Sequence, residues 1–245
     1  MCKDMGNTCE IIHRAAKAEV DRLGEWRLSA LLHIMEAAAQ EHCIRLGIDR
    51  DTLYREKGLV WMLSRIIVQR FRSPIEGEDL TTRTICANPG NVTFPRWFQV
   101  EDAQGNLVCS ASSLWVLVDL TSRRIVLPKR AGVSCPDADF PNLDPLPEKL
   151  RIPQGPPAFT STHAVSDDEI DANGHVNNKV YADWLVMPEG NIKAIQLDYN
   201  AEVLPGESVN MFYYETDRGY HVSGLFGIGI LPRLTRGLLN DFIVR

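Results

Sequence analysis

The alternation of apolar and polar residues predicts one long helix followed by a run of strands in the first half of the chain. From residue 29 to residue 46, apolar side chains recur at three- and four-residue spacing. This spacing is typical of a helix with one buried face, with Ser29 as its expected N-cap and Gly47 as its end. Strands are expected at 60–71, 80–88, 93–101 and 107–119, separated by turn-forming residues. A helix followed by an antiparallel meander indicates an α+β layout in which a sheet covers the helix.

Prolines then become frequent between residues 131 and 157, where apolar periodicity is weak. Such a segment is typical of a linker that runs over the surface. After it the same order of elements restarts in a shorter form, with strands expected near 158–165, 193–200, 208–215, 219–227 and 237–244. The chain is therefore expected to contain an N-terminal domain over 1–130, a linker over 131–157 and a C-terminal domain over 158–245.

The two halves also match at the level of single residues. Segment 66–78 aligns without gaps on 195–207, and segment 21–24 aligns on 171–174. At the three positions of the candidate site the halves differ, because the first half has Leu23, Glu25 and Ser73 where the second has Asn173, His175 and Glu202. The halves thus share one order of elements, and only the second carries Asn, His and Glu at these three positions. One active site per chain is expected, with Glu202 within reach of His175 or of a shared water.

The densest polar cluster is Asp171, Asn173 and His175, which alternate with Ala172 and Gly174. An extended loop would place the three polar side chains on one side. The apolar spacing that follows predicts a helix over 177–185 with an Asn as N-cap. The N–H groups at its start are the expected donors to an oxyanion. They belong to Val176, Asn177 and Asn178. An ordinary capped helix start explains any one of these residues, but the whole cluster favours a catalytic loop.

Composition narrows the functional classes. Hydrophobic residues make up 44% and charged residues 24% of the chain, as in an ordinary globular protein. The net charge of −6 gives no support for nucleic-acid binding. The 6 cysteines form no CxxC pair and no zinc-type cluster, so no metal site is expected and reduced thiols in a cytoplasmic protein are indicated. The sequence shows no signal-peptide pattern and no apolar run long enough for a membrane span.

Several motifs resemble those of the acyl-acyl carrier protein thioesterases, and the likeness to the bacterial type covers 11–127 and 161–226. The motifs lie at 28–42, 58–65 and 111–119, and the most specific is Asp-x-Asn-x-His-Val-Asn-Asn-x-x-Tyr at 171–181. The resemblance implies a tandem (double) hot-dog fold, in which each half is an antiparallel sheet wrapped around a central helix. It also implies catalytic roles for Asp171, Asn173, His175 and Glu202. A shorter form of the motif occurs in acyl-CoA thioesterases of the wider superfamily.

The implied reaction is hydrolysis of a fatty acyl thioester to a free fatty acid. A thioester is already activated, so the reaction needs a positioned water, a base and a donor for the carbonyl oxygen, but no metal or organic cofactor. Either Glu202 or Asp171 is a candidate base, with His175 relaying the proton and Asn173 orienting water or carbonyl. The favoured mechanism is attack by a water molecule with Glu202 as the base, while Asp171 orients His175. Many plant members carry a Cys after this Glu, but the residue here is Val203, so a thiol nucleophile at that position is excluded.

Substrate recognition is expected to involve the first half of the chain. Its apolar residues are candidates to line an acyl pocket, although each alone is better explained as core. The pocket candidates are Leu31, Met35, Ala38, Trp61, Leu63 and Trp115. The expected partner is an acyl carrier protein bearing a phosphopantetheine-linked acyl chain, which basic groups would dock. The docking candidates are Arg65, Arg70, Arg72, Arg123, Arg124, Lys129 and Arg130.

The sequence is also compatible with other functions. An acyl-CoA thioesterase would share the same active site and differ only in its carrier surface. A non-catalytic module that binds acyl chains or the carrier protein is a second alternative, and a hot-dog dehydratase is a weaker one. Self-association into a homodimer is also left open.

Overall fold

The computed structural model describes residues 7–21, 24–136, 144–171, 174–185, 192–217, 219–227 and 239–244. The chain divides into two compact units, which are described one at a time: unit 1 is Met1–Pro147 and unit 2 is Glu148–Arg245. In the described part of the chain, no helix combines the length and the apolar character needed to cross a membrane.

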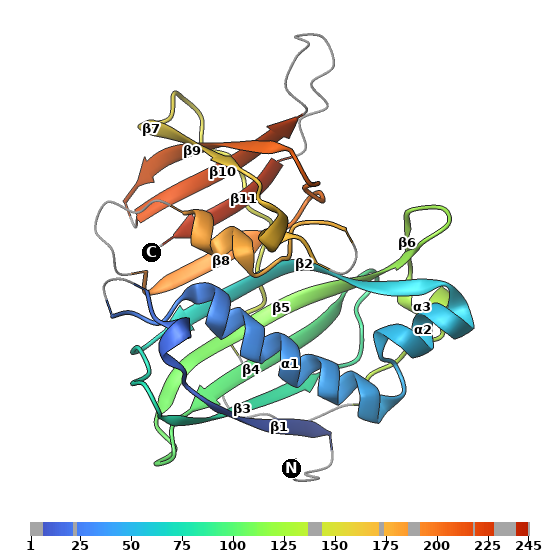
Figure 1. The fold of residues 1–245 in the computed structure, drawn as a ribbon. Coiled ribbons are helices and arrows are strands. Elements are labelled where there is room, and N and C mark those ends of the chain that lie inside the picture. Colours follow the sequence, from blue (N-terminus) through green and yellow to red (C-terminus); the bar gives the residue numbers. More distant parts are fainter. Residues whose placement is uncertain are drawn as a thin grey trace. The chain divides into compact units, whose positions relative to one another are not determined.

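Unit 1 is an antiparallel sheet with a long helix across one face (Figure 1). Its strands follow the order β1-β3-β4-β5-β2, and β6 pairs with β5. The elements are β1 (Thr8–Arg14), the 3-10 helix η1 (Lys17–Glu19), α1 (Leu28–Leu46), α2 (Arg50–Lys57), β2 (Leu59–Arg70), β3 (Asp79–Cys86), β4 (Phe94–Glu101), β5 (Leu107–Asp119), β6 (Arg124–Val126) and α3 (Pro128–Ala131). The strands predicted at 60–71, 80–88, 93–101 and 107–119 are confirmed to within two residues at each end.

The long helix α1 forms where the apolar spacing predicts it. Leu31 and Ala38 are 0% exposed, so one face of the helix is fully buried. The helix ends at Gly47, whose φ of 66° is a left-handed conformation that glycine adopts without strain. The predicted N-cap is wrong, because Arg27 and not Ser29 precedes the first helical residue. The Arg27 N–H donates to the carbonyl of Glu19 at 2.8 Å, so a tertiary contact sets the helix start.

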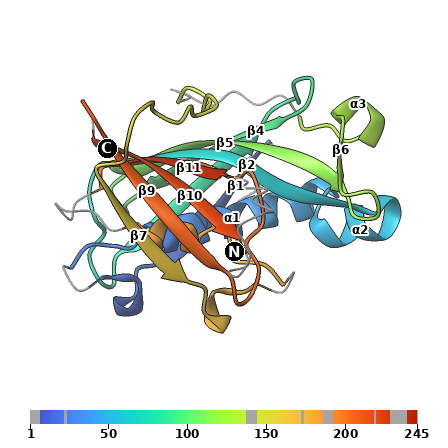
Figure 2. The same cartoon turned by 90° about the horizontal axis from the view of Figure 1, so that it is seen from above.

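A short second helix, α2, was not predicted from the sequence. Only Leu53 of its eight residues is buried, which leaves no apolar stripe to detect. Local capping holds it instead, since the Asp49 carboxylate accepts the N–H groups of Asp51 and Thr52 at 3.1 Å each. Together with β6 and α3 it gathers at one end of unit 1 (Figure 2).

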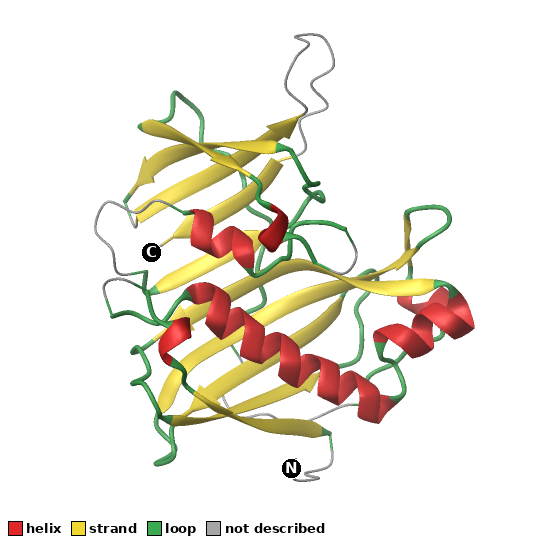
Figure 3. Cartoon of the chain, viewed as in Figure 1, coloured by secondary structure: helices red, strands yellow, loops and turns green. Residues whose placement is uncertain are grey.

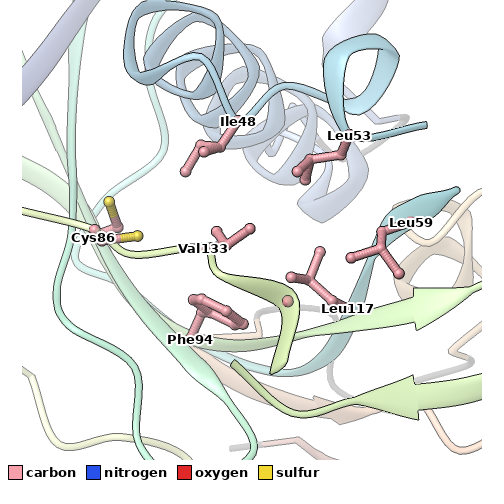
Figure 4. Close-up of a cluster of buried hydrophobic side chains, with 9 residues drawn as sticks. Ile48, Leu53, Leu59, Cys86, Phe94, Leu117 and Val133 are labelled. Carbon is pink, nitrogen blue, oxygen red and sulfur yellow. The ribbon is translucent and has the colours of Figure 1, made fainter. Parts of the chain in front are cut away.

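That end of unit 1 is built over a cluster of buried apolar side chains (Figure 4). Trp61 packs at its edge, with its ring perpendicular to that of Phe94 at 4.8 Å, and donates its indole N–H to the carbonyl of Ile48 at 2.7 Å. The buried members are Ile48, Leu53, Leu59, Cys86, Phe94, Leu117, Ala131, Val133 and Cys135.

The segment predicted as a surface linker is partly packed into unit 1. Val133 and Cys135 are 6% and 4% exposed, so the prediction is wrong for these residues, whose apolar side chains complete the cluster. Further along, the carbonyl of Asp144 accepts the indole N–H of Trp97 at 2.8 Å. On the other side of the boundary, the Leu150 N–H donates to the Asp198 carboxylate at 3.0 Å within unit 2. The described parts of this proline-rich segment are thus anchored to the unit in which they lie.

Unit 2 is a five-stranded antiparallel sheet in the order β8-β11-β10-β9-β7. Its elements are β7 (Phe159–Ala164), the 3-10 helices η2 (Asp167–Glu169) and η3 (Val180–Trp184), β8 (Ala194–Asp198), β9 (Ser208–Thr216), β10 (Gly219–Gly227) and β11 (Leu239–Val244). All five predicted strands are present. The described helical residues of this unit are the short turns η2 and η3 (Figure 3).

The helix predicted over 177–185 is corrected to the five-residue η3, whose N-cap is Lys179 and not an Asn. The preceding residues are held in a loop by their own contacts. The N–H of Asn177 donates to the carbonyl of Glu169 at 2.9 Å, and its side-chain oxygen accepts the N–H of Lys179 at 3.2 Å. These contacts delay the first helical residue to Val180.

Candidate active site

A tight loop in unit 2 carries His175, and Asp171 shapes it. The loop, residues 171–178, is called the His175 loop below. The Asp171 N–H donates to the carbonyl of His175 at 2.8 Å, and the Gly174 N–H donates to the carbonyl of Asp171 at 3.0 Å. One carboxylate oxygen of Asp171 accepts the His175 N–H at 3.4 Å. Gly174 has a φ of 82°, which requires glycine at this turn. Asp171 therefore orients the backbone of His175, and Asn173 lies outside the described residues.

The segment that carries Glu202 is held against this loop by three contacts. The Val176 N–H donates to the carbonyl of Val203 at 2.9 Å. The Tyr199 hydroxyl donates to the carbonyl of Asn178 at 2.8 Å, and the buried Tyr181 hydroxyl hydrogen-bonds the backbone of Val203. Burial raises the pKa of Tyr181 above its usual value, so this phenol stays neutral.

These contacts bring the imidazole of His175 and the carboxylate of Glu202 together. His175 Nε2 lies 3.2 Å from Glu202 Oε2, which is the proximity expected from the sequence. The two side chains are 22% and 28% exposed, so the pair is partly accessible to solvent. A carboxylate beside an imidazole can take a proton from water, or stabilise the imidazolium that forms when His175 takes it.

The predicted oxyanion donors are corrected by the hydrogen bonds of the loop. The N–H groups of Val176 and Asn177 are already donated to Val203 and Glu169, so neither is available to a substrate. No acceptor for the Asn178 N–H is present among the described residues. The five-residue η3 is also too short to contribute a substantial helix dipole. Of the three predicted donors, Asn178 alone remains.

Unit 1 repeats the loop with different chemistry. Its Asp21 N–H donates to the carbonyl of Glu25 at 2.8 Å, and the Gly24 N–H donates to the carbonyl of Asp21 at 3.2 Å, as in the His175 loop. The Ser73 hydroxyl donates to the Glu25 carboxylate, and Arg70 lies 3.6 Å from the same carboxylate. The alignment of the halves is therefore confirmed in space, because Glu25 meets Ser73 as His175 meets Glu202. Glu25 and Ser73 include no imidazole, and Glu25 lies beside the buried guanidinium of Arg70. The two residues therefore do not form an acid–base pair like that of His175 and Glu202.

The predicted acyl-pocket residues are core or partly buried residues of unit 1. Leu31, Met35 and Ala38 on α1 are at most 1% exposed, and Leu63 is 9% exposed. Trp61 and Trp115 are partly buried against the cluster of Figure 4. Unit 1 also has a cavity of about 700 Å³ near α2, β6 and α3, which is lined by other residues. A role of the six candidates in acyl binding remains a prediction.

The predicted docking residues differ in their exposure and in their partners. Arg70 is 9% exposed and donates to the carbonyl of Trp26 at 3.0 Å, so its assignment to a docking surface is wrong. Arg72 is bound by the carboxylates of Glu78 and Asp102, the latter at 2.9 Å. By contrast, four cations around β6 and α3 are exposed. They are Arg123, Arg124, Lys129 and Arg130. Arg65 on β2 is half-buried.

One carboxylate beside the site was missed by the sequence reasoning. Glu169 lies two residues before Asp171 and accepts hydrogen bonds from His163 at 2.9 Å and from Trp184 at 2.6 Å. A signal was present in the sequence, because Ser166-x-x-Glu169 has the form of a capping box and His13 and Glu19 in the first half have the same spacing as His163 and Glu169.

Two models of one protein family match this chain. The family model described as acyl-ACP thioesterase N-terminal domain matches residues 13–128, and that of the C-terminal domain matches 158–225. Oleoyl-acyl carrier protein thioesterase 1 of Arabidopsis thaliana is 21% identical over 201 residues, which cover 71% of this chain and 55% of that protein. The chain thus spans about half the length of the curated relatives it matches.

Solved structures show the same fold. An acyl-ACP thioesterase from Bacteroides thetaiotaomicron matches with a TM-score of 0.80 and 21% identity, and 99% of each chain is covered. The 12:0-ACP thioesterase from Umbellularia californica matches with a TM-score of 0.76 and 19% identity, covering 98% of each chain. The predicted α+β double hot-dog fold is confirmed by these matches. The two family models span most of the chain's length, so the chain belongs to the acyl-ACP thioesterase family.

Proposed function

We propose that this protein hydrolyses the thioester of a fatty acyl-acyl carrier protein and releases the free fatty acid. The observation that carries the proposal is the 3.2 Å contact between His175 and Glu202, made by partly exposed side chains next to a glycine turn. Family membership supports the reaction class, because both domain models describe acyl-ACP thioesterases.

The chemistry follows from the two side chains. Glu202 takes a proton from an attacking water, directly or through His175, and the hydroxide adds to the thioester carbonyl. Collapse of the tetrahedral intermediate breaks the C–S bond, and whichever member of the pair took the proton, the Glu202 carboxyl or the His175 imidazolium, returns it to the departing thiolate. The products are a fatty acid and the thiol of the carrier, so atoms balance with one water consumed. Asp171 keeps His175 in place through the backbone, and Asn173 is the proposed side chain that orients water or carbonyl.

The free Asn178 N–H is the proposed backbone donor to the oxyanion. It is two residues from Val176 in the loop that carries His175, and no other group of the described chain accepts it. One such donor typically lowers the barrier by about 3 kcal/mol when it is held in place before the reaction.

Direct attack by Asp171 is the alternative mechanism, and it would leave an acyl group on the protein. The Asp171 carboxylate is turned toward the backbone N–H of His175, which favours an orienting role. Rapid-quench mass spectrometry of the intact protein during turnover distinguishes the two. We expect no acyl adduct, and an adduct on Asp171 would replace water attack by the covalent route.

Substrate recognition is proposed to use a carrier-docking surface with fewer residues than predicted, together with the predicted acyl-pocket residues. The carrier-docking surface consists of the exposed Arg123, Arg124, Lys129 and Arg130. The acyl chain is proposed to contact the apolar candidates on α1, β2 and β5. Acyl-CoA is the alternative substrate, because the short form of the His175 motif is shared with acyl-CoA thioesterases.

The test measures hydrolysis of acyl-carrier and acyl-CoA thioesters that bear the same acyl chain, over a series of chain lengths. We expect faster turnover of the carrier-linked substrate, and loss of that preference when the four exposed cations are changed to Gln. Comparable or faster hydrolysis of acyl-CoA would assign the enzyme to the alternative substrate. Absence of hydrolysis on both substrates would instead favour a binding module.

A further inference from the structure

A second carboxylate lies behind the His175 loop and takes no part in the mechanism above. The Glu169 side chain is only 12% exposed. It accepts hydrogen bonds from His163 Nε2 at 2.9 Å, from the Ser166 N–H at 2.9 Å and from Trp184 Nε1 at 2.6 Å. Of these three hydrogen bonds on one largely buried carboxylate, only that from Ser166 lies within its own turn.

The side-chain contacts of Glu169 join its own turn, η2, to two other elements. His163 lies on β7, Ser166 is the N-cap of η2, and Trp184 ends η3. The backbone carbonyl of Glu169 also accepts the N–H of Asn177 at 2.9 Å. Glu169 therefore stands two residues before the His175 loop and contacts the far end of that loop through Asn177 and η3. These four contacts are called the Glu169 clamp.

Aromatic packing stiffens the clamp. The ring of His163 stacks on that of Trp184, with centroids 4.5 Å apart, and Trp184 also packs on Tyr181 at 4.7 Å. Trp184 is 5% exposed, so its indole N–H would be left buried without an acceptor if the carboxylate were removed. Burial raises the pKa of Glu169, but the hydrogen bonds, led by that from His163, outweigh it and hold the pKa below its usual value. The carboxylate is thus ionised near neutral pH, which strengthens each contact.

The first half of the chain contains the same device without a catalytic pair. Glu19 accepts hydrogen bonds from His13 Nε2 at 2.9 Å and from the Ala16 N–H at 2.8 Å, and its carbonyl accepts the Arg27 N–H at 2.8 Å. The loop that follows carries Glu25 instead of a His. The same contacts thus occur in both units, at Glu19 and at Glu169, and only in unit 2 does the following loop carry a histidine, His175.

We propose that Glu169 is a positioning residue, which fixes the His175 loop so that the imidazole faces Glu202. The carboxylate binds Ser166 before the loop and Trp184 at the end of η3 after it, while the backbone carbonyl of the same residue accepts the Asn177 N–H. Glu169 acts through His175 and does not touch substrate. The inference rests on the proposed function for its kinetic consequence, but its structural consequence at His175 can be measured without substrate.

The experiment compares Glu169→Gln with Glu19→Gln as a matched control in the same chain. Both changes remove one clamp carboxylate and should lower the urea midpoint by similar amounts. Glu169→Gln should lower kcat by roughly 10- to 100-fold, because a loop shift of about 1 Å misplaces an acid–base group by enough to cost that factor. KM should change less than about threefold. Glu19→Gln should leave kcat within about twofold of the wild-type value.

Nuclear magnetic resonance supplies a readout that a general loss of stability does not move. The ¹⁵N shift of His175 Nε2 reports its contact with Glu202, and it should change in Glu169→Gln but not in Glu19→Gln. Equal kcat losses in the two variants, or an unchanged His175 shift in Glu169→Gln, would overturn the proposal. A wild-type protein without thioesterase activity would defeat the proposed function, while the His175 shift would still decide the role of the clamp.

A milder variant keeps the test decisive if Glu169→Gln does not fold. Trp184→Phe removes only the 2.6 Å donor to Glu169 and leaves the other three contacts. We expect it to fold, to shift the His175 resonance in the same direction and to lower kcat by a smaller factor. A folded Trp184→Phe variant with the wild-type shift and kcat would contradict the clamp.

Discussion

Removing the carboxylate of Glu202 perturbs the pair that is central to the proposed chemistry. His175 Nε2 and Glu202 Oε2 are 3.2 Å apart, and the side chains are 22% and 28% exposed. At this separation and exposure, the charge of Glu202 stabilises an imidazolium by about 1 to 4 kcal/mol, with partial solvent screening favouring the lower values. This energy corresponds to roughly 5- to 1000-fold in rate. General-base action adds to it, so Glu202→Gln should lower kcat by roughly 10²- to 10⁴-fold.

A double-mutant cycle with His175→Ala shows whether the two residues act as one unit. If they do, the double variant should be about as slow as the slower single variant, because either change already disables the pair. The assay is single-turnover release of fatty acid from an acyl-carrier thioester. Glu215→Gln is the control, since it removes an exposed carboxylate from β9 of the same unit. The folding stability of Glu202→Gln should change by less than about 1 kcal/mol. Rate losses that multiply in the double variant would refute a shared proton path.

Three further predictions concern stability. Burial, reinforced by the charge of Arg96, lowers the pKa of His42 from 6.5 to about 4. His42 binds a proton more readily in the unfolded chain than in the folded one. The contribution of neutral His42 to the free energy of unfolding should therefore be fully present above pH 6.5 and fall by up to about 3 kcal/mol toward pH 4. His42→Gln should flatten this part of the urea-midpoint profile. Gly174→Ala, at a φ of 82°, should cost about 1 kcal/mol and lower kcat, whereas Gly24→Ala, at 83°, should cost the same stability with kcat unchanged. Leu31→Ala, at a 0% exposed site, should cost about 2 to 5 kcal/mol in urea unfolding. A loss below about 1 kcal/mol for Leu31→Ala would contradict the packing of α1.

The elements with strong local patterns could be predicted from the sequence. Helix α1 has an apolar face and a terminal glycine at Gly47, and turn-forming residues separate the strands of unit 1. The elements without such a pattern could not. Helix α2 buries only Leu53, and the start of α1 is set by the contact of Arg27 with Glu19, which is made across a loop.

The candidate site divides in the same way. The pairing of His175 with Glu202 was readable from the motif and from the alignment of the halves. The engagement of the Val176 and Asn177 N–H groups was not, because their acceptors belong to distant Val203 and to Glu169. Arg70 was mistaken for a surface cation for the same reason, since its burial depends on the folded loop around Trp26. Hydrogen bonds to backbone groups that are distant in the sequence do not affect the local spacing of apolar residues.

The most direct test of the account measures hydrolysis of an acyl-carrier thioester by the wild-type chain and by Glu202→Gln under identical conditions. The account predicts release of free fatty acid by the wild type and a kcat at least about 100-fold lower in the folded variant. Wild-type turnover by Glu202→Gln would contradict the assignment of the His175–Glu202 pair as the catalytic centre.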